Sequence, residues 1–174
     1  MTEVILNYCL AFAYPRSRNG ESCQLVWDLR DPPSTAAQLI SSSLRQRLTS
    51  SFKVLQSQPA TTPPVNTLYI SCELLPWQII ARNRQGVTVR DVLEAIYNVT
   101  HAPLTHDEWE RLSLKQQERI KRVFDVRWRE AANPEQERKN GVRRVDCLLQ
   151  VRTLAHPPVL NSNTLAFSAP DWAG

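Results

Sequence analysis

Glycine, clustered cysteine and long apolar runs are scarce in this chain, and each shortage excludes a class of function. Only 4 of its 174 residues are glycine, and none lies in a phosphate-cradling loop or a nucleophile elbow. The four cysteines, Cys9, Cys23, Cys72 and Cys147, form no CxxC pair. This spacing predicts buried, reduced thiols rather than a disulfide framework or a zinc site. We therefore expect no metal and no cofactor.

No apolar stretch reaches the ~18 residues that a membrane-spanning helix needs. Segment 1–14 has no basic region, and Glu3 and Asn7 make it a poor secretory signal. Together with the reduced thiols, these features predict an intracellular protein, cytoplasmic or nuclear, with no membrane partner.

The remaining composition, 42% hydrophobic and 22% charged, is that of an ordinary globular protein. The length predicts one domain, and we expect it to span residues 24–156. Residues 1–23 would form an N-terminal arm or edge strand, and residues 157–174 a peripheral tail. Paired prolines, such as those at 32–33 and 157–158, are typical of rigid extended connectors.

Strand patterns come first along the chain. Alternation and β-branched residues predict strands over 25–29, 67–74 and 78–82, with a bend at Pro76-Trp77. Residues 34–50 are ambiguous, because helical apolar spacing competes with many serines and threonines. A final strand is predicted over 142–151.

Helix starts are marked by side chains that can cap the first turn. Thr88 with Asp91, Thr105 with Glu108, and Ser113 with Gln116 each have capping-box spacing. We expect the third helix to run to about residue 132, followed by a polar loop over 133–140. Strands early, helices in the middle and a strand late predict an α+β domain, a mostly antiparallel sheet with a helical cluster on one face.

The third predicted helix has two contrasting faces. The apolar one would be buried and contains Ile120, Val123, Phe124 and Trp128. The basic one is the candidate for nucleic acid or an acidic partner, and contains Lys115, Arg119, Arg122 and Arg129. Glu118, Asp125 and Glu130 dilute its field, as on an ordinary solvated face. Nucleic-acid binding through it would be weak and lost at raised salt.

Charged residues also gather in two of the predicted strand segments. If the first and last strands are close, they form a structural ion-pair network of Asp28, Arg30, Asp31, Arg143, Arg144 and Asp146. The alternative is a hydrolase that uses Asp28 or Asp146 as a catalytic carboxylate. His101 and His106 lack the ligand spacing of a metal site.

Three of the five tryptophans are candidates for a protein interface, because tryptophan is enriched at interaction hot spots. They are Trp27, Trp77 and Trp172. Packing in the core explains the same residue type, and Trp128 is expected there.

The order of several motifs resembles a fungal family, expanded in mushroom-forming fungi and known as a domain of unknown function. The match covers roughly residues 24–155. Its motifs are Trp27-Asp28-Leu29 with Pro32-Pro33, Leu74-Leu75-Pro76-Trp77-Gln78-Ile79, Val87 to Tyr97, and Gly141 to Leu149. The resemblance implies an intracellular fungal protein and supplies no activity, cofactor or catalytic residue.

These observations favour a non-enzymatic protein-interaction or self-association module, with a protein partner or a second copy bound. The first alternative is a nucleic-acid-binding adaptor that uses the basic helix face. The hydrolase comes second.

Overall fold

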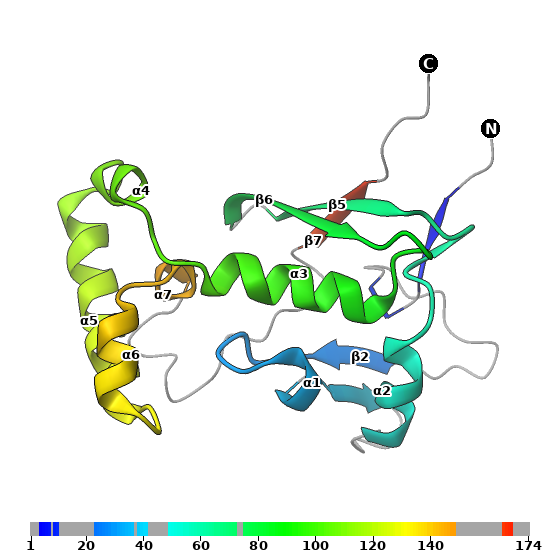
Figure 1. The fold of residues 1–174 in the computed structure, drawn as a ribbon, viewed down its shortest axis with the longest axis horizontal. Coiled ribbons are helices and arrows are strands. Elements are labelled where there is room, and N and C mark those ends of the chain that lie inside the picture. Colours follow the sequence, from blue (N-terminus) through cyan, green and yellow to red (C-terminus); the bar gives the residue numbers. More distant parts are fainter. Residues whose placement is uncertain are drawn as a thin grey trace. The chain divides into compact units, whose positions relative to one another are not determined.

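The computed structural model describes residues 4–7, 9–10, 23–36, 38–41, 49–72, 75–148 and 165–168. The chain divides into two compact units. The first unit contains Met1–Tyr97 and Val159–Gly174, and the second contains Asn98–Pro158. Figure 1 labels the helices and strands of both.

The strands of the first unit pair antiparallel throughout. β1 (Ile5–Leu6) pairs with β4 (Thr61–Thr62), and β2 (Cys23–Val26) pairs with β3 (Gln38–Ser41). The largest sheet has the order β6-β5-β7, formed by Leu75–Arg82, Thr67–Cys72 and Leu165–Ser168. Strands therefore arise both in the predicted arm and in the predicted tail.

Alternation along β5 and β6 produces one buried face of the sheet. Leu68 is paired with Ala81, and Ile70 with Ile79, and all four side chains are buried. Because side chains on a strand alternate between faces, this register places the four together on the inward side. The sequence prediction of a strand over 67–74 is confirmed for 67–72.

The first unit also contains α1 (Pro33–Ala36), α2 (Thr49–Gln56) and most of α3 (Val89–His101). The predicted cap of α3 is present, because the Asp91 carboxylate accepts from the backbone N–H of Thr88 at 2.8 Å. Val92, Leu93 and Ile96 of this helix are buried. Trp27 belongs to the same core, with its ring centroid 6.4 Å from that of Tyr97.

The second unit is helical in its described residues. It contains α4 (His106–Glu110), α5 (Leu114–Glu130), α6 (Pro134–Asn140) and α7 (Arg144–Leu148). The capping boxes predicted at Thr105 and at Ser113 are both formed. α6 and α7 both pack against α5, as Figure 1 shows for α6.

Two predictions for the second unit are wrong. Residues 134–140 are a helix rather than a loop, because Asn133 caps the first turn, Pro134 fits its first position and Gly141 ends it at positive φ. Residues 144–148 are a helix rather than a strand. Here the Asp146 carboxylate accepts from the Arg143 N–H at 2.9 Å and holds the first turn.

Pro76 and Trp77 lie within β6, at the sheet edge, where a strand tolerates proline. The register of β6 with β5 shifts between the Ile70–Ile79 and Cys72–Leu75 pairs, so the strand is irregular where the sequence predicts a bend.

Two other predictions for the first unit need correction. β2 ends at Val26, and a turn follows in which the Asp31 N–H donates to the Asp28 carbonyl. The ambiguous segment 34–50 contributes to α1, β3 and α2, with 37 and 42–48 outside the described residues.

The α+β class predicted from the sequence is confirmed, with helices and antiparallel sheets in one chain. None of the described helices is both long and apolar enough to cross a bilayer.

Candidate functional site: the basic face of helix α5

α5 is held in the second unit by a buried ion-pair network that involves three helices. The Arg127 guanidinium contacts the Asp146 carboxylate through Nε at 2.7 Å and Nη2 at 2.9 Å. It is also ion-paired with Glu137 and donates to the Gly141 carbonyl at 3.0 Å. Asp146 is 0% exposed. The network therefore joins α5, α6 and α7 at a point shielded from solvent.

The sequence predicts Asp146 and Arg143 as ion-pair residues, but neither Arg127 nor Glu137. Arg127 was not singled out, although its position follows the apolar spacing of Ile120, Val123 and Phe124. A guanidinium on a buried stripe needs an acidic partner, and this rule points to Arg127 from the sequence alone.

Three arginines of the predicted network form ion pairs within their own unit. Arg30 contacts Asp28 within the first unit, with Nη2 2.6 Å from Oδ2. In the second unit, Arg143 pairs with Glu137 at 3.1 Å and Arg144 with Glu108 at 2.9 Å. Asp31 is exposed, and its carbonyl accepts from the Trp27 indole at 2.9 Å.

The basic face of α5 is exposed as predicted. Lys115, Arg119, Arg122 and Arg129 are all exposed, whereas Ile120 and Val123 on the other face are buried. Phe124 and Trp128 are half-buried. The helical spacing read from the sequence therefore separates the two faces correctly.

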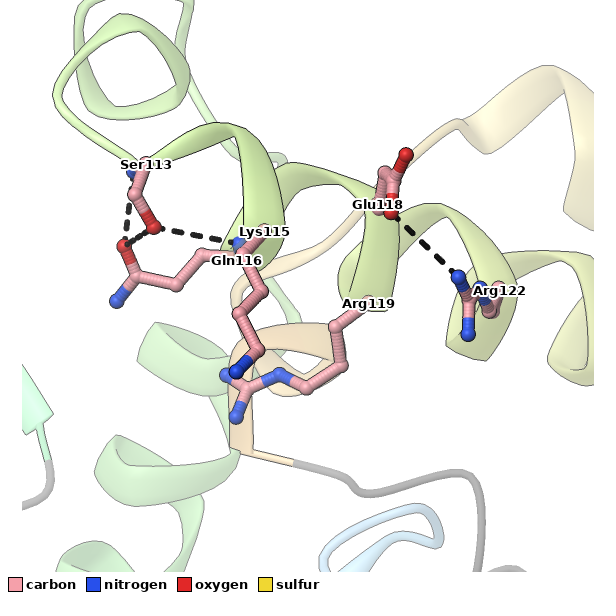
Figure 2. A pocket seen from close by; sticks show the side chains of 6 residues that line it. All are labelled: Ser113, Lys115, Gln116, Glu118, Arg119 and Arg122. Atoms are coloured by element: carbon pink, nitrogen blue, oxygen red, sulfur yellow. Dashed lines mark hydrogen bonds and ion pairs between the residues drawn. The ribbon is translucent and has the colours of Figure 1, made fainter.

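A depression of about 460 Å³ lies along the first half of α5. Described residues that line it are Ser113, Lys115, Gln116, Glu118, Arg119 and Arg122. We call this depression the α5 groove. Figure 2 shows the Lys115 and Arg119 side chains extending to the same side of the helix, while the Ser113 hydroxyl donates a hydrogen bond to the Gln116 side chain.

Among the described residues, the α5 groove has more positive than negative side chains. Glu118 reaches Arg122 only at 3.5 Å, and both side chains are largely exposed. Arg119 donates to the Cys147 carbonyl at 3.0 Å, a contact that positions the guanidinium and leaves its charge in place. Lys115 and Arg119 are like charges one helical turn apart, an arrangement that destabilises a helix slightly unless an anion lies nearby. The α5 groove is therefore suited to an anionic ligand.

Leu114, the residue before Lys115, is 81% exposed. Such exposure of a large aliphatic side chain adds an apolar contact point near the basic residues. It had no signal in the sequence beyond its position after the Ser113 cap.

The predicted interface tryptophans do not form one surface in the described residues. Trp27 is 1% exposed and belongs to the core, and Trp77 is half-buried in β6. Trp172 lies outside the described residues.

Among the described residues, the candidates for a catalytic carboxylate or thiol lie in environments that do not favour catalysis. The Asp28 and Asp146 carboxylates both accept bonds from guanidiniums. Burial raises the pKa of the Cys9 thiol to about 12, and burial with the nearby Asp146 raises that of Cys147 to about 11. No three His, Cys, Asp or Glu side chains in the described part of the chain are grouped to hold a metal.

The fold and site define a small α+β protein with an exposed basic helix face beside a groove. Over residues 25–155 the chain matches a family model described as a family of unknown function, DUF6699, and the chain belongs to this family. No curated protein and no solved structure matches the chain.

Proposed function

We propose that this protein is a non-enzymatic interaction module that binds an acidic segment of a partner protein in the α5 groove. The observation that supports this function is the placement of Lys115, Arg119 and Arg122 along one depression, where Glu118 is the one carboxylate among the described lining residues. The described residues that line the groove are all polar or charged, and their alkyl stems supply apolar surface between the charged groups.

Exposed Leu114 extends the proposed contact. A partner segment with acidic residues and one aliphatic side chain would satisfy both the cations and this apolar surface. The fit favours a peptide over a bare inorganic anion, because only the peptide uses both features.

Nucleic acid is the rival ligand for the same face. Glu118, Asp125 and Glu130 interrupt the run of basic residues on α5. A continuous phosphate backbone would meet these carboxylates, whereas a short acidic segment can be placed between them. This charge pattern favours the protein partner.

The proposal is tested by fluorescence anisotropy with a labelled eight-residue peptide of aspartate, glutamate and one leucine. We expect Lys115→Gln/Arg119→Gln to weaken binding about five- to thirtyfold, since each exposed charge contact contributes up to about 1 kcal/mol. The matched control, Lys53→Gln/Arg84→Gln, removes the same charge from exposed sites of the first unit.

Equal weakening by both double variants would reject a defined site in favour of general charge attraction. Tighter binding of a single-stranded oligonucleotide than of the peptide would favour the nucleic-acid adaptor. Light scattering on the protein alone, at low and at ~1 M salt, tests the alternative of self-association through an apolar surface.

We infer a fungal origin and an intracellular location from the resemblance of the motifs. The thiols of Cys9 and Cys147 are free, which agrees with a reducing compartment. Microscopy of a fluorescent fusion tests the location, and a secreted product would reject it.

A further inference from the structure

Two arginines contact a single tryptophan ring where α5 meets α6. The guanidinium carbon of Arg129 lies 5.0 Å from the Trp128 ring centroid, and that of Arg138 lies 5.3 Å from it. The Trp128 indole N–H donates to Asp125 at 3.1 Å, which fixes the orientation of the ring. Because Arg129 belongs to α5 and Arg138 to α6, the packing of these helices creates the cluster.

The N–H groups of both guanidiniums are available for a ligand. Within the described part of the chain, neither the Arg129 nor the Arg138 guanidinium forms an ion pair or a hydrogen bond. A cation–π contact uses the face of a guanidinium and leaves its in-plane N–H donors unused. Two cations around one ring also repel each other, and a nearby anion would reduce this cost.

We propose that Arg129, Trp128 and Arg138 form an arginine clamp for a phosphoryl group on a phosphorylated side chain of the partner. A phosphoryl group carries nearly two negative charges and three acceptor oxygens, so it can accept bidentate bonds from two guanidiniums. A single carboxylate has fewer acceptors and half the charge. The arginine clamp therefore distinguishes a phosphorylated segment from one that is merely acidic.

This inference rests on the proposed function, because the same segment would occupy the α5 groove. The rise along the α5 axis from Lys115 to Arg129 is about 21 Å, at 1.5 Å per residue. About six residues of extended peptide cover that length. The partner segment would therefore place its phosphorylated residue about six positions from the acidic residues that contact Lys115.

The surroundings of the arginine clamp favour a peptide over a nucleic acid. Asp125 holds the indole, and Glu130 is the last residue of α5, so carboxylates flank the two cations. One phosphoryl group can avoid them, but successive phosphates of a backbone cannot. The ring is already contacted by two guanidiniums, which leaves it poorly available for a stacked base.

The test uses three labelled peptides that differ at one position, six residues from an acidic cluster, where they carry phosphoserine, serine or aspartate. Anisotropy with the full chain should show the phosphoserine peptide bound about tenfold more tightly than the other two. Arg129→Gln and Arg138→Gln should each remove most of that preference. The control Lys139→Gln removes one charge from the exposed neighbour of Arg138 and should leave the preference within twofold.

Failure of the arginine clamp and failure of the α5 groove give different results. If the three peptides bind equally and Lys115→Gln/Arg119→Gln still weakens them, the clamp is wrong and the proposed function stands. If none binds, both are wrong. Loss of the preference in Lys139→Gln to the same extent as in Arg138→Gln would also overturn the clamp, as would tighter binding of an oligonucleotide that depends on Arg129.

Discussion

Replacing Asp146 by asparagine should destabilise the second unit strongly. Asp146 is 0% exposed, and its carboxylate accepts two bonds from Arg127 and one from the Arg143 backbone N–H. Asp146→Asn keeps the volume and removes the charge, so the Arg127 guanidinium stays buried without its full counter-charge. Breaking a buried pair from one side costs about 3–5 kcal/mol.

Two charge-assisted bonds of about 1.5–3 kcal/mol each give a similar magnitude from the geometry. For a chain of this size, the loss corresponds to a fall in Tm of roughly 6–20 °C. We would measure the free energy of unfolding in urea, followed by circular dichroism at 222 nm, where the helices of the second unit contribute.

The matched control is Glu118→Gln, which breaks the exposed pair with Arg122 and should cost less than about 1 kcal/mol. The double variant Arg127→Met/Asp146→Asn should cost less than the sum of the single variants, because the two side chains form one interaction. Equal free energies of unfolding for Asp146→Asn and Glu118→Gln would refute the role assigned to the network.

Three further predictions concern the first unit and the thiols. Trp27→Ala should cost about 3–5 kcal/mol in chemical denaturation, because the ring is buried; a loss below 1 kcal/mol would contradict its place in the core. The pKa of Asp91 is lowered from its ordinary 3.8, since hydrogen bonds from Asn83 and Thr88 outweigh the partial burial that acts to raise it. Its contribution to the free energy of unfolding is therefore present above pH 3.8 and lost as pH falls through the folded pKa. Asp91→Asn should destabilise the protein at pH 7 and progressively less below pH 3.8. A stability difference from the wild type that does not change with pH would contradict this. The thiol pKa values of Cys9 and Cys147 are about 12 and about 11, so iodoacetamide at pH 8 should alkylate both far more slowly in the folded protein than in the unfolded protein. Rapid alkylation of either cysteine in the folded protein, detected by mass spectrometry, would show an accessible thiolate.

Local signals predicted the helices well wherever capping and apolar spacing agreed. The Thr88, Thr105 and Ser113 caps and the two faces of α5 depend only on neighbours within about one turn, so the sequence contains them. α6 was also readable in this way, because Asn133, Pro134 and Gly141 are standard start and stop residues. The charged residues of this segment favoured the prediction of a polar loop over that of a helix.

Features that depend on distant residues were not predictable. The strand expected over 142–151 had the right apolar content, but the Asp146 carboxylate and its bonds to Arg127 favour a helical turn there. Likewise, the contact of Arg138 with Trp128 depends on how α6 packs on α5. The residues of the basic face could be predicted from the sequence. The groove beside it and the arginine clamp at its end depend on the tertiary structure.

The central claim is that an acidic segment binds along α5. The most direct test is a ¹H–¹⁵N correlation spectrum of the protein, recorded during titration with the unphosphorylated peptide of aspartate, glutamate and leucine. The account predicts saturable shifts concentrated in residues 113–122, which vanish in Lys115→Gln/Arg119→Gln. Shifts confined to β5 and β6, or none at all, would contradict it.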